Sequence, residues 1–201
     1  MTPVSRPDRL EGVVTVHLEA FPGFFMTQLG RRFLRAYYRC VVDSPRGILL
    51  TEDREGGCVG FVAGFVDPAA FYRELSRRRT QLGLAACAGI VTQPWRLMAL
   101  FANYRRAHGT ARQPPGSRTA ELSSLAVKPG GEGRGIGSRL VHAFIEAARA
   151  LGADRVMLTT DAHGNDAVNR FYLRLGFTCV RSFEARRGRW LNEYALTIRG
   201  D

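Results

Sequence analysis

Lysine, paired cysteines and long apolar runs are all scarce in this sequence of 201 residues. Lys128 is the one lysine, whereas arginine occurs throughout the chain. The cysteines lie far apart, at positions 40, 58, 87 and 179, so no pair has the spacing of a metal site or a redox motif. We therefore expect neither a metal ion nor a disulfide framework.

The longest apolar runs, residues 58–66 and 82–91, are much shorter than the roughly 18 residues that a membrane-spanning helix requires. The amino-terminal segment lacks the continuous apolar core of a signal peptide, because His17 and Glu19 interrupt it. We therefore expect no membrane partner and a cytoplasmic location.

The formal net charge is +11 at pH 7, and a protein of this charge attracts anions such as polyphosphate cofactors or nucleic acids. The arginines form small groups, for example at residues 77–79 and 186–189, instead of one dense basic tail. The sequence also contains no motif for RNA recognition. We therefore expect no nucleic-acid partner, although a basic RNA-associated module remains an alternative.

A content of 45% hydrophobic and 23% charged residues is typical of globular proteins, and the length predicts a single domain over residues 1–201. Apolar periodicity predicts helices over residues 8–20 and 27–42, then a two-stranded hairpin within 47–66. Residues 67–117 are expected to form a helical insertion. The rest alternates between strands and helices, which predicts a mixed α/β sheet: strand 119–127, helix 135–151, strand 155–160, helix 166–175 and two strands around the RRGRW turn.

The stretch KPGGEGRGIGSRLV, residues 128–141, places several glycines ahead of a helical pattern. Gly133, Gly135 and Gly137 repeat at every second position, unlike the GxGxxG of dinucleotide-binding folds. The loop also lacks the Gly-Lys-Ser/Thr ending of a Walker loop. A strand, a glycine-lined turn and the electropositive start of a helix nevertheless form an anion site. The residues alone therefore predict an anion-binding turn, with a tight turn that binds nothing as the alternative.

These residues resemble the GCN5-related N-acetyltransferase (GNAT) family, whose signature is Gln/Arg-x-x-Gly-x-Gly/Ala. Residues 132–137, EGRGIG, match this signature except at Glu132. The preceding ELSSLAVKPG, residues 121–130, is similar to the family's fourth strand. The later NDAVNRFYLRLGF, residues 165–177, is similar to its Asn-x-x-Ala-x-x-x-Tyr-x-x-x-Gly-Phe segment, with Val168 in the alanine position.

The resemblance implies the GNAT fold, of class α/β (α+β type), in which a mixed central sheet of about six or seven strands is flanked by helices. The helical insertion at about 67–117 would then lie between the third and fourth strands. It also implies an N-acetyltransferase that uses acetyl-CoA (coenzyme A) as its cosubstrate.

By the same resemblance, the glycine-rich loop holds the cofactor pyrophosphate through backbone N–H groups, since a Cβ atom would keep the phosphate away. The residues that donate these groups are Gly133, Gly135, Ile136, Gly137 and Ser138. Positive charge is expected from Arg134 and Arg174, while Glu132 is expected to point to solvent.

The pantetheine arm is expected to pair with a bulged strand at Leu125, Ala126 and Val127, where an amide polarises the thioester carbonyl. A plain central strand is the compatible alternative. Phe171 belongs to the expected cofactor site. Asn165 is expected to bind the pantetheine amide, to cap the following helix, or to do both.

Glu121 lies where several family members carry a general base. An alkylamine with a pKa of about 10 must lose a proton before it attacks, so a carboxylate or a water that it orders is useful. His163 is the competing base because its intrinsic pKa lies nearer neutrality. Tyr172 stands where the family has a tyrosine that protonates the leaving thiolate. The alternatives are a strand-end acid, an incidental loop histidine and a core aromatic residue.

The resemblance places the acceptor groove between the first two helices and the loop that joins the last two strands. Phe21, Phe24, Phe25 and Trp190 are expected to line an apolar pocket there or to belong to the core. The insertion is expected to cover the groove or to form the surface of a homodimer, which favours a small-molecule amine acceptor. A catalytically idle acyl-CoA sensor remains a further alternative.

Overall fold

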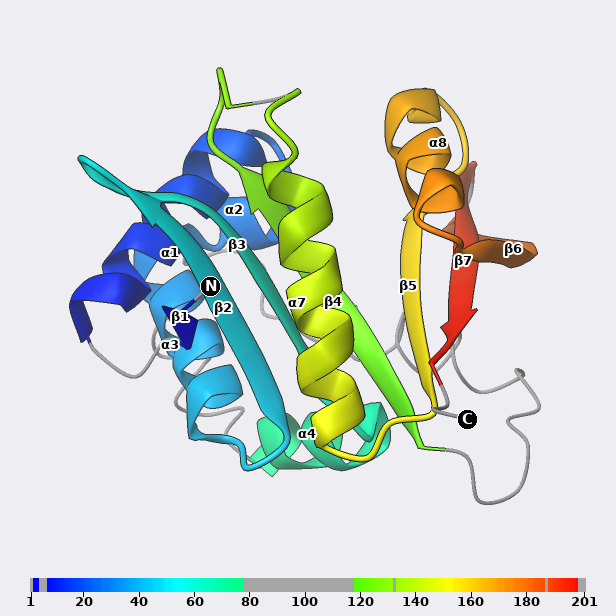
Figure 1. Ribbon diagram of the computed structural model, residues 1–201, viewed down its shortest axis with the longest axis horizontal. Coiled ribbons are helices and arrows are strands. Elements are labelled where there is room, and N and C mark those ends of the chain that lie inside the picture. Colours follow the sequence, from blue (N-terminus) through cyan, green and yellow to red (C-terminus); the bar gives the residue numbers. More distant parts are fainter. Residues whose placement is uncertain (1, 4–6, 78–117, 132, 187, 199–201) are drawn as a thin grey trace.

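The computed structural model describes residues 2–3, 7–77, 118–131, 133–186 and 188–198 (Figure 1). Its helices are α1 (Pro7–Ala20), α2 (Phe25–Gln28), α3 (Gly30–Asp43), α4 (Pro68–Arg77), α7 (Ile136–Ala150) and α8 (Asp166–Arg174). Its strands are β1 (Thr2–Pro3), β2 (Gly47–Arg54), β3 (Gly57–Val66), β4 (Thr119–Val127), β5 (Arg155–Asp161), β6 (Thr178–Arg186) and β7 (Arg189–Thr197).

The strands form one seven-stranded sheet in the order β1-β2-β3-β4-β5-β7-β6. β4 and β5 pair in parallel, and the neighbouring pairs β3–β4 and β5–β7 are antiparallel. This mixed sheet confirms the predicted fold class. α4 begins the predicted insertion between β3 and β4, and the remainder of that insertion lies outside the described residues. None of the described helices is long and apolar enough to cross a membrane.

α7 covers one face of the sheet, where it lies across β3 and β4 (Figure 1). Its buried residues recur at helical spacing and form a continuous apolar stripe: Ile136, Leu140, Val141, Phe144, Ile145 and Ala148. Two glycines of β3 make room for it. A Cβ atom on Gly60 would lie 3.0 Å from the Ile136 side chain, and one on Gly64 would lie 2.7 Å from the Phe144 ring. The glycines of β3 therefore set how closely α7 approaches the sheet.

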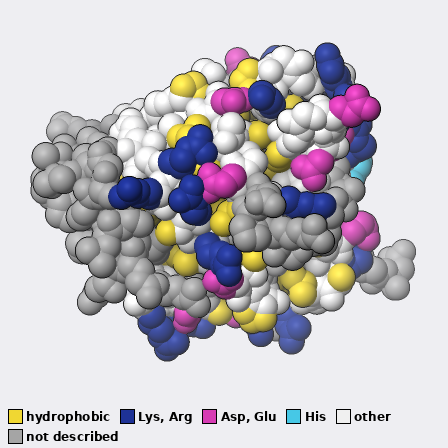
Figure 2. Space-filling model, turned by 90° about the vertical axis from the view of Figure 1, so that its left-hand side faces the viewer, with side chains coloured by type: hydrophobic (Ala, Val, Ile, Leu, Met, Phe, Trp, Pro, Cys, Tyr) yellow, Lys and Arg dark blue, Asp and Glu magenta, His cyan; other side chains and the backbone are white. Residues whose placement is uncertain are grey.

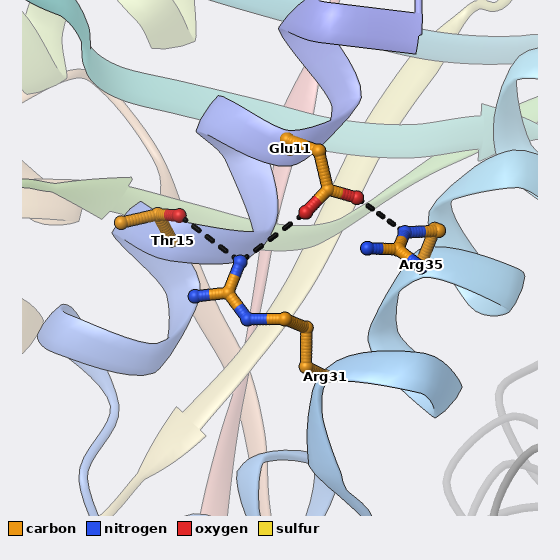
Figure 3. Close-up of polar contacts among 4 residues, drawn as sticks. All are labelled: Glu11, Thr15, Arg31 and Arg35. Atoms are coloured by element: carbon orange, nitrogen blue, oxygen red, sulfur yellow. Dashed lines mark hydrogen bonds and ion pairs between the residues drawn. The ribbon is translucent and has the colours of Figure 1, made fainter.

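α1, α3 and α4 cover the opposite face, where Phe33, Tyr38 and Phe61 are among the largest fully buried side chains. On the outer side of α1 and α3, the Glu11 carboxylate binds Arg35 and accepts a 3.2 Å hydrogen bond from Arg31 (Figure 3). The hydrogen bond from Arg35 is the main reason that the pKa of Glu11 is lowered. These side chains are well exposed, so the pairs orient α1 against α3 more than they stabilise the fold.

β4 and β5 pair only where both strands begin, from Thr119↔Arg155 to Glu121↔Met157. Beyond these pairs the two strands diverge, as Figure 1 shows toward its upper part. In the same region the register of β3 against β4 shifts between Ala63 and Gly64, which leaves Ser123 as the extra residue of a β-bulge. The Ser123 hydroxyl donates a 3.1 Å hydrogen bond to the Ala63 carbonyl oxygen. The sheet is therefore split on one side of β4 and kinked on the other.

One local prediction is wrong in detail. The helix predicted over residues 27–42 is interrupted at Leu29, because Gly30 has a φ of 86°, in the left-handed region that glycine adopts readily. The bulge expected in the fourth strand is present at Ser123, and Leu125 to Val127 follow it in regular register with β3. Placing a bulge requires the contacts of the neighbouring strand, which the local pattern does not contain.

The face shown in Figure 2 carries arginine and lysine side chains interspersed with acidic ones, without a single basic stripe. Among the described residues, ion pairs join basic and acidic side chains, for example Arg9 with Asp53 and Arg39 with Asp43.

Candidate active site

A cleft of about 660 Å³ occupies the region where β4 and β5 diverge. The end of the α1–α2 segment, the bulged part of β4, the end of β5 and the start of α8 all contribute to its walls. A volume of this order suits a small ligand or part of a larger one. Among the residues that the structure describes, no group of three or more His, Cys, Asp or Glu side chains is arranged to hold a metal ion.

One wall of the cleft is apolar and comes from the segment after α1. Phe21, Phe24, Phe25 and Met26 line it, and Phe24 is 50% exposed. The carbonyl oxygen of Phe21 accepts a 2.7 Å hydrogen bond from the Thr27 hydroxyl, which holds this turn against α2. The predicted aromatic pocket is therefore present, although Trp190 lies between two lining residues of β7 and is itself 43% exposed.

The opposite wall is polar and is fixed by contacts between β5, β7 and α8. Arg189 binds both carboxylate oxygens of Asp161, at 2.7 and 3.1 Å. Asn169 of α8 accepts a hydrogen bond from the Thr160 hydroxyl and donates one to the Asp161 carbonyl oxygen. These contacts hold the start of α8 beside the end of β5, where His163 and Asn165 face the cleft.

Tyr172 lies at the base of the cleft and is 5% exposed. Its ring contacts Phe171, Phe177 and Tyr194, so both readings of this residue, core aromatic and cleft residue, describe it. Burial raises the pKa of its phenol, so the hydroxyl stays protonated far above neutral pH. A protonated phenol beside a reaction site is suited to donate a proton.

Glu121 does not line the described cleft. It sits at the last β4–β5 pair, and its carboxylate accepts a 2.9 Å hydrogen bond from the Tyr72 hydroxyl of α4. Of the two bases that the sequence offers, His163 is the one that faces the cleft in the described residues.

The glycine-rich loop connects β4 to α7 as predicted. Gly133 and Gly135 have φ values of 75° and 70°, and Gly135 is the residue from which α7 starts. Ile136 is 2% exposed and packs in the core, so the first turn of α7 is anchored and its backbone N–H groups project from a fixed point. Arg134 and Arg174 are both exposed, and Glu132 lies outside the described residues.

Arg139 lies one turn into α7 and contacts the glycine-rich loop, a role that the motif does not reveal. Its Nη1 donates a 3.0 Å hydrogen bond to the Arg134 carbonyl oxygen, and its guanidinium also binds Glu52 of β2. The loop is thereby tied to a distant strand through the Arg134 carbonyl oxygen. The contact joins residues 87 positions apart, so no local pattern could have found it.

Asn165 precedes α8, yet its side chain makes no capping hydrogen bond there. The backbone alone begins the helix, through the 3.0 Å bond from Asn169 N to Asn165 O. Since Asn165 lines the cleft, its amide is placed for a ligand instead of the helix end. Of the two roles that the sequence offered, the described geometry therefore favours the binding role.

His17 is a second residue whose importance the sequence did not show. It lines the cleft from α1, is 3% exposed, and its Nδ1 lies 2.7 Å from the Tyr38 hydroxyl oxygen. Burial lowers its pKa from 6.5 to about 4, so the imidazole is neutral at pH 7. Within the described part of the chain, its buried Nε2 has no hydrogen-bond partner.

A model of the acetyltransferase (GNAT) family matches residues 10–177, which is most of the chain. The chain therefore belongs to this family, and the resemblance inferred from its motifs is confirmed. The expected class of enzyme, an acetyl-CoA-dependent N-acetyltransferase, is confirmed with it.

Individual relatives are more distant. A mycothiol acetyltransferase of Beutenbergia cavernae is 38% identical over 66 residues, which span 33% of this chain and 22% of that protein. The match thus covers about a fifth of the length of this curated relative.

Solved structures share the fold. A GNAT acetyltransferase from Desulfovibrio desulfuricans has a TM-score of 0.64 at 15% identity, covering 98% of both chains. Arabidopsis thaliana NAA60, in complex with a bisubstrate analogue, has a TM-score of 0.63 at 17% identity, covering 100% of this chain and 98% of the other. An aminoglycoside 6'-N-acetyltransferase complexed with coenzyme A has a TM-score of 0.62 at 15% identity, covering 100% and 97%.

Proposed function

We propose that this enzyme transfers the acetyl group of acetyl-CoA to the primary amine of a small molecule, directly and within a ternary complex. One observation carries this proposal: the split between β4 and β5 opens a cleft with an aromatic wall on one side and a polar wall on the other. A thioester entering from the glycine-rich loop would meet an amine bound between these walls.

The proposed cofactor site uses the loop and the free edge of β4. The N–H groups of Gly133, Gly135, Ile136, Gly137 and Ser138 hold the pyrophosphate, with Arg134 and Arg174 adding positive charge. The pantetheine arm runs along Leu125, Ala126 and Val127, because β5 has left this edge of β4. Asn165 binds a pantetheine amide, and Phe171 packs beside Gly137, where a Cβ atom would lie 3.4 Å from its ring.

Tyr172 is proposed to protonate the leaving thiolate of coenzyme A. Tyr172→Phe should lower kcat by about 100-fold, a usual size for loss of a general acid, while the Kd for acetyl-CoA changes less than about threefold. The matched control is Tyr194→Phe, which removes a hydroxyl from the same aromatic cluster, at a ring distance of 6.3 Å and outside the cleft lining. Steady-state kinetics and calorimetry measure the two effects. Equal turnover by wild type and Tyr172→Phe would end the assignment.

Two bases remain proposed, Glu121 and His163. The residue that deprotonates the amine should control the acidic limb of the kcat/KM profile against pH, since its protonated form cannot act. We expect His163→Gln to depress this limb by at least about tenfold if His163 is the base. Glu121→Gln should do so instead if Glu121 is the base, acting through an ordered water. Profiles of both variants that follow wild type would reject both assignments.

The acceptor is proposed to be a small molecule because the cleft volume of about 660 Å³ lies within the range of small-ligand sites. One similar protein is by its name a mycothiol acetyltransferase and another is an aminoglycoside 6'-N-acetyltransferase, and both names agree with this choice. A single domain over residues 1–201, a cytoplasmic location and a homodimer formed by the insertion stay predictions.

The direct test combines calorimetric titration of the full chain with acetyl-CoA and measurement of coenzyme A release over a panel of small amines. Binding with amine-dependent release supports the proposal. Normal binding without release over the panel favours an idle acyl-CoA sensor instead. Absence of binding, together with a salt-dependent shift of RNA, would favour the RNA-associated module.

A further inference from the structure

His17 stands at the end of a row of hydrogen-bonded side chains that begins at Ser124 on β4. Ser124, the residue after the bulge, shares a side-chain hydrogen bond with Tyr38 of α3. Tyr38 is fully buried and its hydroxyl lies 2.7 Å from Nδ1 of His17 on α1. These hydrogen bonds thus connect β4, α3 and α1. The last polar atom of the hydrogen-bonded row is Nε2 of His17.

The hydrogen bonds among Ser124, Tyr38 and His17 determine which ring nitrogen of His17 carries the proton. A phenol is a better donor than an aliphatic hydroxyl, and the bare nitrogen of a neutral imidazole is a strong acceptor. Tyr38 therefore donates to Nδ1, and Ser124 donates to the Tyr38 oxygen. Nδ1 is then the acceptor nitrogen and Nε2 carries the hydrogen, because a hydrogen bond at one ring nitrogen sets the state of the other.

The buried Nε2–H has no partner within the described residues, and His17 belongs to the lining of the cleft. A buried donor left unsatisfied destabilises the protein, so a ligand that offers an oxygen there gains the full value of the bond. Beside it lies the apolar wall: the Phe21 ring is 4.9 Å from the His17 ring, and Phe24 is 5.2 Å from Phe21. The site therefore combines one buried donor that lacks a partner in the described residues with an aromatic surface.

We propose that His17 binds the acceptor: its Nε2–H donates a hydrogen bond to an oxygen of an amine whose apolar part lies against Phe21 and Phe24. The acceptor class is thus a small amine that carries a hydroxyl or carbonyl oxygen together with an apolar body. This inference rests on the proposed acetyl transfer and adds the chemistry of the acceptor to it.

The protonation state can be tested without any acceptor. The full chain is labelled with 15N-histidine, acetyl-CoA is added, and His17→Gln identifies the His17 signals by their loss. The inference requires the hydrogen on Nε2 and a bare Nδ1. A hydrogen on Nδ1 overturns it, whether or not the protein proves to be an acetyltransferase.

The acceptor class is tested with a matched pair of amines, phenylalaninol and 2-amino-1-phenylpropane, which differ by one hydroxyl oxygen. Wild type should have a kcat/KM at least about tenfold higher for phenylalaninol, and His17→Phe should lose this preference through KM, because one buried hydrogen bond is removed. The Kd for acetyl-CoA should stay within about twofold of wild type, since His17 lies on the acceptor side. His17→Gln, which places an amide N–H near the position of Nε2, should recover part of the preference.

Glu11→Gln is the matched control, because it weakens the α1–α3 contacts on the outer side of the same helix without touching the cleft. It should keep the wild-type preference. Preference for the oxygen-bearing amine that survives in His17→Phe overturns the role of His17, and release of coenzyme A with neither amine overturns the acceptor class. Failure of wild type to bind acetyl-CoA would instead reject the proposed function.

Discussion

Replacing Gly137 by glutamate is expected to abolish acetyl-CoA binding while the protein stays folded. Gly137 lies in the first turn of α7, and a Cβ atom there would point at the Phe171 ring, 3.4 Å away, and at Val127, 4.0 Å away. A carboxylate at this position enters the space proposed for the pyrophosphate. Two like charges about 4 Å apart repel by about 4 kcal/mol near a protein surface, which corresponds to a loss of affinity of about 1,000-fold.

Two variants at the same position separate charge from size. Gly137→Gln has the shape of the glutamate and no charge, so it should weaken binding by about tenfold at most, whereas Gly137→Ala should bind within about threefold of wild type. Gly137 does not have a positive φ, unlike Gly133 and Gly135, so neither variant strains the backbone. Alanine and glutamate also suit a helix start better than glycine does. An unchanged calorimetric Kd in Gly137→Glu would remove the pyrophosphate from this loop.

The second large effect is expected at Gly64, on stability. A Cβ atom there would lie 2.0 Å from the Glu121 carbonyl oxygen and 2.7 Å from the Phe144 ring. The added methyl group would be confined between the backbone of β4 and the buried Phe144 ring, and neither can shift far enough to make room. Gly64→Ala should therefore lower the free energy of unfolding by about 3 kcal/mol or more. Thermal unfolding should show this as a drop of about 10 °C in Tm for a chain of this size.

Gly60→Ala, in the same strand, is the matched control. The Cβ atom it adds would lie 3.0 to 3.1 Å from the ends of the Ile136 and Leu140 side chains and from the Ala126 carbonyl oxygen. Side-chain ends can shift, so the expected loss is about 1 kcal/mol. If Gly64→Ala unfolded at the same temperature as Gly60→Ala, the close approach of β3 to the bulge would not hold.

The elements that the sequence predicted well are those whose information is local. The apolar positions of α7 recur at helical spacing and are buried together, and the glycine-rich loop needs the backbone conformations that Gly133 and Gly135 have. The motifs around the loop and around Tyr172 were sufficient to identify the family. The strand–helix order of the second half followed from the same signals.

The features that the sequence could not predict depend on contacts between distant segments. The bulge at Ser123 is decided by how β3 and α7 fit together around Gly64, and the Glu121 carboxylate meets Tyr72 across 49 positions of sequence. His17 is an ordinary residue of an amphipathic helix until Tyr38 engages its Nδ1 and the divergence of β4 from β5 makes the residue part of the cleft lining. Which side chains line the cleft therefore depends on how all the strands of the sheet are arranged, and no local pattern contains this information.

The proposed donor site uses main-chain groups and the cleft uses side chains, and this difference has an evolutionary consequence. The proposed donor site consists of main-chain groups on glycine positions, which most point mutations leave in place, whereas the cleft presents the side chains of Phe24, His17 and Arg189. Single substitutions can therefore redirect such a protein to new amines while its acyl donor stays the same. This explains why shared ancestry identifies the donor with ease and says little about the molecule that is modified.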